Sequence, residues 1–291
     1  MKETIEFRKE RDLGSILTDT FRFIRLEWKP LMGLIIRVPG IALLFVVLAY
    51  IYYIRTTLGS FGMDGGMLGG GVISSGFEAL VAVLLLLASA LVFYTLLYGT
   101  VLYYIKQYVD SPGEVDVKLV ERQLREGFWD LIGLNFLNIL MIGLGMVFCL
   151  IPGIYLGVVL ASTFSILIME KRDVMDSISQ SFQLIKGEWW ITFATILVIG
   201  ILYYIIAIIF QVPQYIYFFA RTFTSNTEIS GDPSQMFDWI YVALSSLGII
   251  AQSLLQTIIV VSTAFIYFNL HEKKHHTGTL ETIQSIGKRE S

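Results

Sequence analysis

Six long apolar stretches, separated by segments that hold almost all of the basic residues, constrain this chain more than any other feature. A run of about 20 apolar residues is long enough to cross a bilayer core about 30 Å thick. The stretches lie at residues 31–54, 78–105, 129–150, 153–169, 190–219 and 239–270. The chain is therefore predicted to be an all-α integral membrane protein with six transmembrane helices.

The basic residues are sorted between the two sides of the predicted membrane. Lys and Arg beside a span tend to stay on the cytoplasmic side. Eighteen of the 21 Lys and Arg residues precede the first span, follow the sixth, or lie between spans two and three or four and five. Arg55 and Arg221 lie in the opposite segments, and Arg37 lies inside the first predicted span. Both termini are therefore predicted to be cytoplasmic.

The composition agrees with a membrane protein. Charged residues make up 15% of the chain, against about 25% in soluble proteins. The single cysteine, Cys149, excludes an internal disulfide and a thiolate metal cluster. No segment between the spans is long enough for a soluble domain. Residues 1–291 are therefore predicted to form one membrane domain.

An internal repeat is visible in the segments that precede two of the spans. LGSILTDTFRFIRLEWKP (13–30) matches VMDSISQSFQLIKGEWWI (174–191) without a gap at a shift of 161 residues. The shared residues include Phe21 with Phe182, Ile24 with Ile185, Glu27 with Glu188 and Trp28 with Trp189. At helical spacing the first copy gathers an apolar stripe opposite its polar residues. The stripe consists of Leu13, Leu17, Phe21, Ile24 and Trp28.

Such amphipathic helices suit the cytoplasmic headgroup layer, with a tryptophan as interfacial anchor. We name them elbow helices. A weaker third copy is VDVKLVERQLREGFWDL (115–131), and the predicted anchors are Trp28, Trp129 and Trp189. The chain is then predicted to consist of repeat units at about 11–106, 113–170 and 172–270, followed by a cytoplasmic tail at 271–291. The alternative is that any helix beside a membrane has this pattern.

Few polar residues within the spans are candidates for function. Arg37 either contacts an anionic lipid or solute, or extends to the headgroups because it lies near the cytoplasmic end of its span. Asn138, Gln252 and Gln256 either line a ligand pathway or hydrogen-bond neighbouring helices. The connection at Pro152 and Gly153 is so short that its hairpin either spans fully or is re-entrant, and both alternatives satisfy the charges.

Sequence motifs for catalysis are absent: the chain has no phosphate-binding loop, no GxSxG and no HExxH. His271 and His275 have the spacing of a metal pair on a helix, but Lys273 and Lys274 between them favour a solvated tail. We therefore predict no catalytic residue, no cofactor, no metal and no nucleic-acid partner.

The segment IPGIYLGVVLASTFSILIMEKRDVMDSISQSFQLIKGEWW (151–190) resembles uncharacterised bacterial multi-pass membrane proteins and the membrane domain attached to some glycerophosphodiester phosphodiesterases. The residues that carry the resemblance are Pro152, Gly153, Glu170, Ser181, Phe182, Leu184 and Trp189. The chain has no room for the phosphodiesterase barrel. The resemblance implies a shared membrane fold without catalysis.

The function predicted from the sequence is that of a non-enzymatic protein of the bacterial inner membrane. It would act as a membrane scaffold or as an accessory subunit of an envelope complex. Its expected partners are the lipid bilayer and other membrane proteins, which would bind the cytoplasmic elbow helices. The alternative is a transporter or channel for a lipid-like or small amphiphilic solute, because transporter folds often contain repeats.

Overall fold

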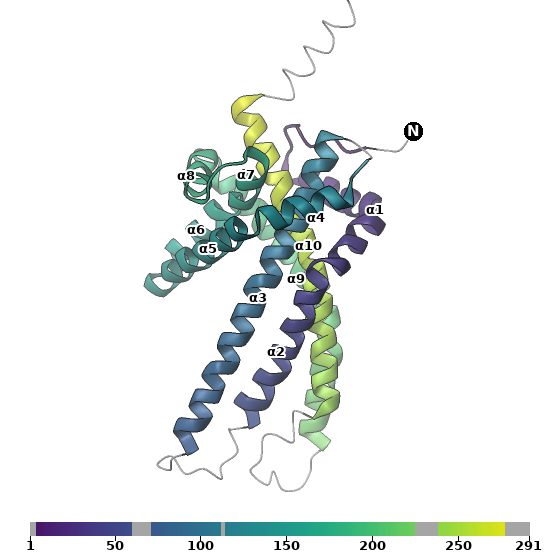
Figure 1. The fold of residues 1–291 in the computed structure, drawn as a ribbon, viewed down its shortest axis with the longest axis vertical. Coiled ribbons are helices and arrows are strands. Elements are labelled where there is room, and N and C mark those ends of the chain that lie inside the picture. The colour runs from purple at the N-terminus through teal and green to yellow at the C-terminus, as the bar shows by residue number, and fades with distance from the viewer. Residues whose placement is uncertain (1–3, 60–70, 112–113, 225–237, 277–291) are drawn as a thin grey trace, which may run out of the picture. The chain divides into compact units, whose positions relative to one another are not determined.

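The computed structural model describes residues 4–59, 71–111, 114–224 and 238–276, and these residues form α-helices without any strand (Figure 1). The prediction of an all-α fold is confirmed. The helices are α1 (Leu13–Arg37), α2 (Pro39–Gly59), α3 (Gly71–Asp110), α4 (Val117–Glu126), α5 (Phe128–Phe148), α6 (Leu150–Leu160), α7 (Thr163–Glu170), α8 (Val174–Ile185), α9 (Trp189–Thr224) and α10 (Trp239–His275).

Six helical segments are long and apolar enough to cross a membrane, as predicted. They are Pro39–Thr56, Gly76–Asp110, Phe128–Phe148, Leu150–Glu170, Trp189–Phe223 and Trp239–His275. The fourth segment contains a break at Ala161 and Ser162, which separates α6 from α7. The last helix extends to His275, so the predicted tail starts later than residue 271, and residues 277–291 lie outside the described part.

The chain divides into two compact units. Unit 1 contains residues 1–38, 95–201 and 257–291, and unit 2 contains residues 39–94 and 202–256. Of the 18 Lys and Arg residues that the structure describes, 16 belong to unit 1, and only Arg55 and Arg221 belong to unit 2. Unit 1 therefore contains the segments that the charges assign to the cytoplasmic side. The single membrane domain predicted for residues 1–291 stays a prediction.

Aspartates begin the three helices that precede spans in unit 1. The Asp12 carboxylate accepts a hydrogen bond from the Ser15 amide at 2.9 Å, and Asp116 accepts one from the Lys118 amide at 2.9 Å. Asp173 is the N-cap residue of α8, but its side chain makes no hydrogen bond to the first turn. An aspartate suits this position because its side chain satisfies an amide that has no partner in the first turn. Asp12 and Asp173 differ by the same 161 residues as the matched segments.

Helix α1 presents two apolar faces. Its buried residues include Ile16, Thr20 and Phe23, and the same shift places Ser177, Ser181 and Leu184 at buried positions of α8. The stripe predicted from the sequence lies on the neighbouring face, where Phe21 is 40% exposed and Trp28 is 53% exposed. The stripe is therefore available to lipid or to a partner.

The N-terminal segment before α1 contributes to the core of unit 1. Phe7 is 2% exposed, and its ring stacks on Phe265 of α10 with 4.5 Å between the ring centroids. Phe23 of α1 and Tyr108 of α3 meet Phe7 edge-on at 5.2 and 5.9 Å. The amide of Ile5 donates a hydrogen bond to the Tyr108 hydroxyl at 3.0 Å. The segment therefore joins α1, α3 and α10.

Helices α5 and α6 run side by side as a tight hairpin (Figure 1). The turn lies at Cys149, three residues before the predicted Pro152–Gly153 turn. Pro152 instead lies in the first turn of α6, where its missing N–H breaks no helical hydrogen bond. A Cβ atom on Gly153 would lie 2.9 Å from the Met146 backbone nitrogen, so glycine is required for this close approach. The hairpin tip is apolar and exposed, with Val147 82%, Phe148 85% and Ile151 75% accessible.

Polar side chains connect the helices of unit 2 near the start of α10. Gln214 of α9 donates a hydrogen bond to the Tyr241 hydroxyl at 2.8 Å. Tyr217 donates to the carboxylate of Asp238, which also lies 3.8 Å from the Arg221 guanidinium. The Asp238 carboxylate accepts a further hydrogen bond from the Tyr241 amide at 3.0 Å. These contacts fix the beginning of α10 against α9.

Candidate functional site

A pocket of about 480 Å³ in unit 1 contains Arg37. We name it the Arg37 pocket, and it is lined by Arg37, Val38, Leu96, Glu121, Leu124, Arg125, Phe128 and Trp129. Arg37 is the last residue of α1, and the first spanning helix starts only at Pro39. The prediction that Arg37 lies inside the first span is therefore wrong, because α1 continues through Pro30 and breaks at Val38.

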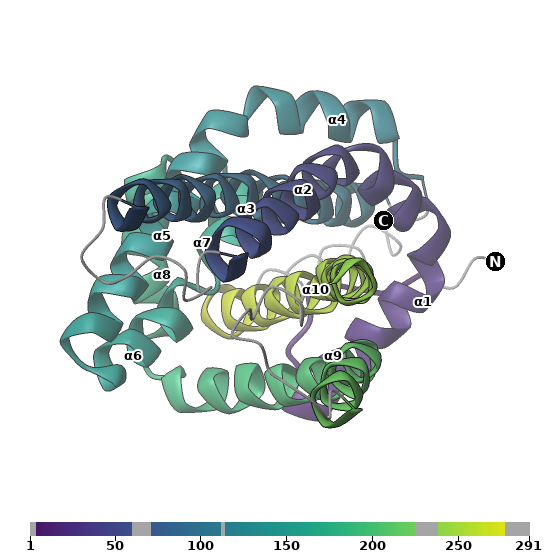
Figure 2. The same ribbon diagram turned by 90° about the horizontal axis from the view of Figure 1, so that it is seen from below.

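Two glycines position the walls of the Arg37 pocket. Gly127 separates α4 from α5, and a Cβ atom there would lie 2.5 Å from the Tyr103 hydroxyl oxygen. A Cβ atom on Gly99 of α3 would lie 2.4 Å from the Leu124 side chain, so this glycine lets α4 approach α3 closely. Figure 1 shows α4 crossing α3, and Figure 2 shows the same two helices from below. The approach places the side chains of α4 beside the end of α1.

The charges of the Arg37 pocket are unbalanced. The Arg37 guanidinium lies 3.7 Å from a carboxylate oxygen of Glu121, and 71% of the Arg37 side chain is exposed. Arg125 adds a second exposed guanidinium. The remaining lining residues are apolar or aromatic. Guanidinium groups bind phosphate and carboxylate well, so the arrangement suits a ligand with one anionic group and an apolar body.

Asn138 does not line the Arg37 pocket but joins two helices inside unit 1. Its amide nitrogen donates a hydrogen bond to the Thr163 hydroxyl of α7 at 2.8 Å. Asn135 makes the equivalent contact to the Thr95 hydroxyl of α3 at 2.9 Å. Both amides are buried. Their geometry agrees with the interpretation that polar residues within the spans connect helices.

Gln252 and Gln256 belong to unit 2, whereas Arg37 and Asn138 belong to unit 1. Both glutamines are partly exposed on α10. The backbone carbonyl of Gln252 accepts a hydrogen bond from the Tyr203 hydroxyl at 3.4 Å. Their predicted role beside a ligand stays a prediction.

The three predicted tryptophan anchors differ in exposure. Trp28 is 53% exposed and Trp129 is 76% exposed. Trp189 is partly buried, because its ring stacks on Phe193 at 5.3 Å and on Tyr155 at 5.7 Å. The neighbouring Trp190 is 76% exposed and was not among the predicted anchors.

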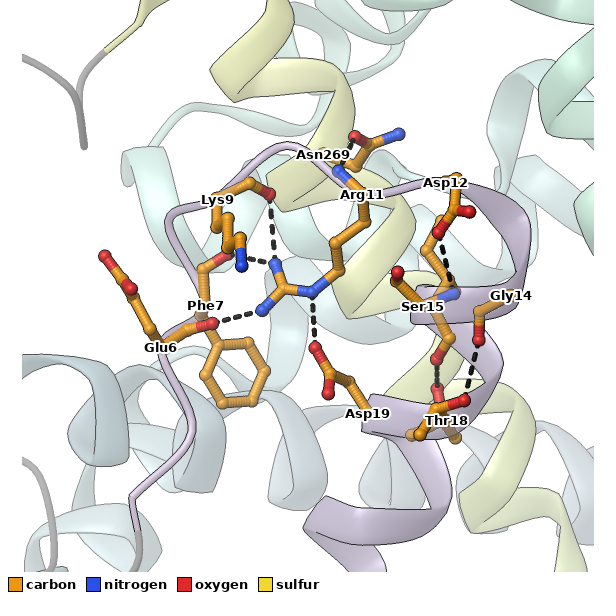
Figure 3. A network of polar contacts seen from close by, with 12 residues as sticks. Glu6, Phe7, Lys9, Arg11, Asp12, Gly14, Ser15, Thr18, Asp19 and Asn269 are labelled. Atoms are coloured by element: carbon orange, nitrogen blue, oxygen red, sulfur yellow. Dashed lines mark hydrogen bonds and ion pairs between the residues drawn. The ribbon is translucent and has the colours of Figure 1, made fainter.

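Nothing in the sequence pattern indicated the network of polar contacts around Arg11 (Figure 3). Arg11 is 7% exposed, and its Nε donates to the Asp19 carboxylate at 2.8 Å. Its other guanidinium nitrogens donate to the backbone carbonyls of Glu6, Phe7 and Lys9. The Arg11 amide donates to Asn269 of α10 at 2.8 Å. The network holds the N-terminal segment against α1 and α10. In the sequence, Arg11 could not be distinguished from the other basic residues that indicate the cytoplasmic side.

The histidines at the end of α10 lie close together, with 4.6 Å between the ring centroids of His271 and His275. Within the described ranges, no group of three His, Cys, Asp or Glu side chains is arranged to hold a metal ion. The predicted lack of a metal or catalytic activity stays a prediction.

Comparison with known families gives a match to the middle part of the chain. The model of an uncharacterised protein family, UPF0259, matches residues 78–228, which is more than half of the chain. The chain belongs to family UPF0259. No curated protein and no solved structure matches it. The UPF0259 match includes α4 to α8, and therefore the Arg37 pocket residues Glu121, Arg125 and Trp129, but not Arg37 itself.

The UPF0259 region also includes the residues on which the predicted resemblance to the phosphodiesterase membrane domain depends, and in this structure they pack helices together. The Ser181 hydroxyl of α8 donates to the backbone carbonyl of Val159 in α6. Glu170 accepts a hydrogen bond from the Tyr267 hydroxyl of α10 at 3.1 Å. Phe182 and Trp189 pack against a cluster that includes Val159. The motif therefore determines packing in unit 1.

Proposed function

We propose that this UPF0259 protein is a non-enzymatic scaffold or accessory subunit of an envelope complex in the inner membrane of a bacterium. The contacts of Asn135 and Asn138 support the proposal most directly. Both amides are buried against threonines of neighbouring helices, which uses their donors for packing. The exposed stripe of α1 adds a surface that such a partner protein could bind.

Two observations support the proposed orientation with both termini in the cytoplasm. Unit 1 holds 16 of the 18 described basic residues, and such residues resist translocation. The Arg11 amide bonds to Asn269, so the beginning of the chain and the end of α10 lie at the same end of unit 1. An inner-membrane protein with an even number of spans would have this arrangement.

The proposed repeat is supported by matching contacts of its two stronger copies. Glu27 of the first copy accepts a hydrogen bond from the Tyr104 hydroxyl of α3 at 2.7 Å. Its counterpart Glu188 accepts one from the Lys273 ammonium of α10 at 2.7 Å. Each glutamate thus contacts the helix that returns from its own hairpin. We also propose that the chain shares its membrane fold with the phosphodiesterase membrane domain.

The scaffold proposal is tested by photo-crosslinking in intact bacterial cells. A crosslinking residue placed at Phe21, on the exposed stripe, is expected to capture one defined membrane protein. The same residue at Arg25, on the polar face of α1, is the matched control. Deletion of the gene should also increase the sensitivity of the envelope to detergent. Absence of both a specific crosslink and an envelope defect would contradict the proposal.

Transport of an amphiphilic solute is the second candidate, and the Arg37 pocket favours it. This function requires flux across proteoliposomes that contain the purified protein. Arg37→Ala and Gln252→Ala should both reduce such flux. If neither substitution changes the flux, the transport candidate loses the residues from which it is argued.

A further inference from the structure

We propose that the Arg37 pocket binds the phosphate group of an anionic phospholipid from the surrounding leaflet. All residues that line the pocket belong to unit 1, so the site is complete within one compact part of the chain. Basic pockets between membrane helices are suited to anionic headgroups. The inference does not depend on the scaffold proposal, because a bound lipid is compatible with a scaffold or a transporter.

The charge balance of the pocket matches a phosphodiester. Two arginines and one glutamate line the pocket, which leaves one excess positive charge among its lining residues. The 3.7 Å separation of Arg37 from Glu121 exceeds the distance of about 2.7–2.9 Å found in charge-assisted hydrogen bonds. A guanidinium has five N–H donors, so Arg37 retains donors for a phosphate. A single negative charge would neutralise the site.

The position of the pocket along the chain matches the headgroup layer. Val38 directly precedes the span Pro39–Thr56, and Phe128 is the first residue of the span Phe128–Phe148. The pocket therefore lies where two chain segments enter the bilayer. Trp129 is 76% exposed at this point, and tryptophan favours the membrane interface.

The apolar lining favours a lipid over a free anion. Val38, Leu96 and Leu124 would contact the glycerol and the first acyl carbons below a bound phosphate. The pocket volume of about 480 Å³ is within the usual range for small-molecule sites. A free phosphate would leave these apolar surfaces uncovered and would gain no hydrophobic contact.

The test is native mass spectrometry of the full-length protein in zwitterionic micelles. The protein is titrated separately with phosphatidylglycerol, phosphatidylcholine and inorganic phosphate. The parent protein should bind one phosphatidylglycerol more tightly than phosphatidylcholine and should not retain inorganic phosphate. The double substitution Arg37→Ala with Arg125→Ala should weaken phosphatidylglycerol binding by about tenfold or more, because two charge-assisted contacts are lost.

Two further variants separate a lost site from a damaged fold. Arg122→Ala removes a guanidinium on the same helix that pairs with Glu126 at 2.8 Å and does not line the pocket, so binding should be unchanged. Glu121→Gln removes the competing carboxylate and should tighten binding. The proposal is overturned if the double variant binds phosphatidylglycerol like the parent, if Arg122→Ala weakens it equally, if Glu121→Gln weakens it, or if inorganic phosphate binds as tightly.

Discussion

Substitution of Gly153 by alanine tests how closely α5 and α6 approach each other. The new Cβ atom would lie 2.3 Å from Cγ of Met146, 2.9 Å from its backbone nitrogen and 3.0 Å from its Cα atom. The Met146 side chain can rotate away, but the backbone of α5 cannot. The helices would have to separate by about 0.5 Å to restore ordinary contact distances.

The magnitude follows from two opposing effects. Overpacking of a close contact costs about 1–3 kcal/mol. Alanine in place of glycine within a helix contributes about 0.5–1 kcal/mol in the opposite direction. We therefore expect Gly153→Ala to lower the free energy of unfolding by about 1–2 kcal/mol. Gly157 lies on the same helix, and a Cβ atom added there would meet no atom within 4 Å, so Gly157→Ala should raise that free energy by about 0.5–1 kcal/mol.

The assay is reversible unfolding of the full-length protein in mixed micelles, followed by tryptophan fluorescence. Trp189 stacks on Tyr155 of α6 and reports on this region. The two variants carry the same chemical change on one helix, so their opposite signs isolate the contact with α5. A Gly153→Ala protein as stable as Gly157→Ala would refute the close approach.

Three shorter predictions concern other parts of the structure. Arg11→Ala should lower the free energy of unfolding by about 2–3 kcal/mol, because a buried charged donor is lost. The control is Arg25→Ala on the exposed face of α1, and an equal effect of the two substitutions would contradict a stabilising role of the Arg11 network. Cys149 in intact spheroplasts should resist a membrane-impermeant maleimide, because the apolar hairpin tip favours burial in lipid, and rapid labelling would show full crossing. Hydrogen bonds from Ser15 lower the pKa of Asp12. The ionised N-cap therefore stabilises α1 above the ordinary carboxyl pKa, and this stabilisation is lost as the pH falls through the lowered pKa. Amide hydrogen exchange at Ser15 should follow this pH dependence, and Asp12→Asn should remove it.

The number of helices that are long and apolar enough to cross a bilayer could be predicted, because length and hydropathy alone decide this property. The boundary before the first span could not. The apolar stretch at residues 31–54 predicted that the first span starts at Leu31, but α1 continues to Arg37. This shift moves Arg37 from the inside of a span to its entrance, which changes the expected environment of its charge.

The Arg37 pocket was only partly visible in the sequence. Glu121 and Arg125 have the spacing of ordinary polar residues on an amphipathic helix, so nothing in the pattern indicated that they face Arg37, more than 80 positions away. The Arg11 network is a similar case, because Asn269 follows Arg11 by 258 residues. Local periodicity identifies helices, but it does not identify partners that only the tertiary fold brings together.

The contact of the N-terminal segment with α10 has a consequence for biosynthesis. Phe7 and Arg11 are synthesised more than 250 residues before their partners Phe265 and Asn269. Until then, the Phe7 ring and the Arg11 amide lack the contacts that they make with α10 in the finished protein. Unit 1 can therefore be completed only after α10 has been synthesised, and a chain that stalls before α10 would have an N-terminal segment held by α1 and α3 alone.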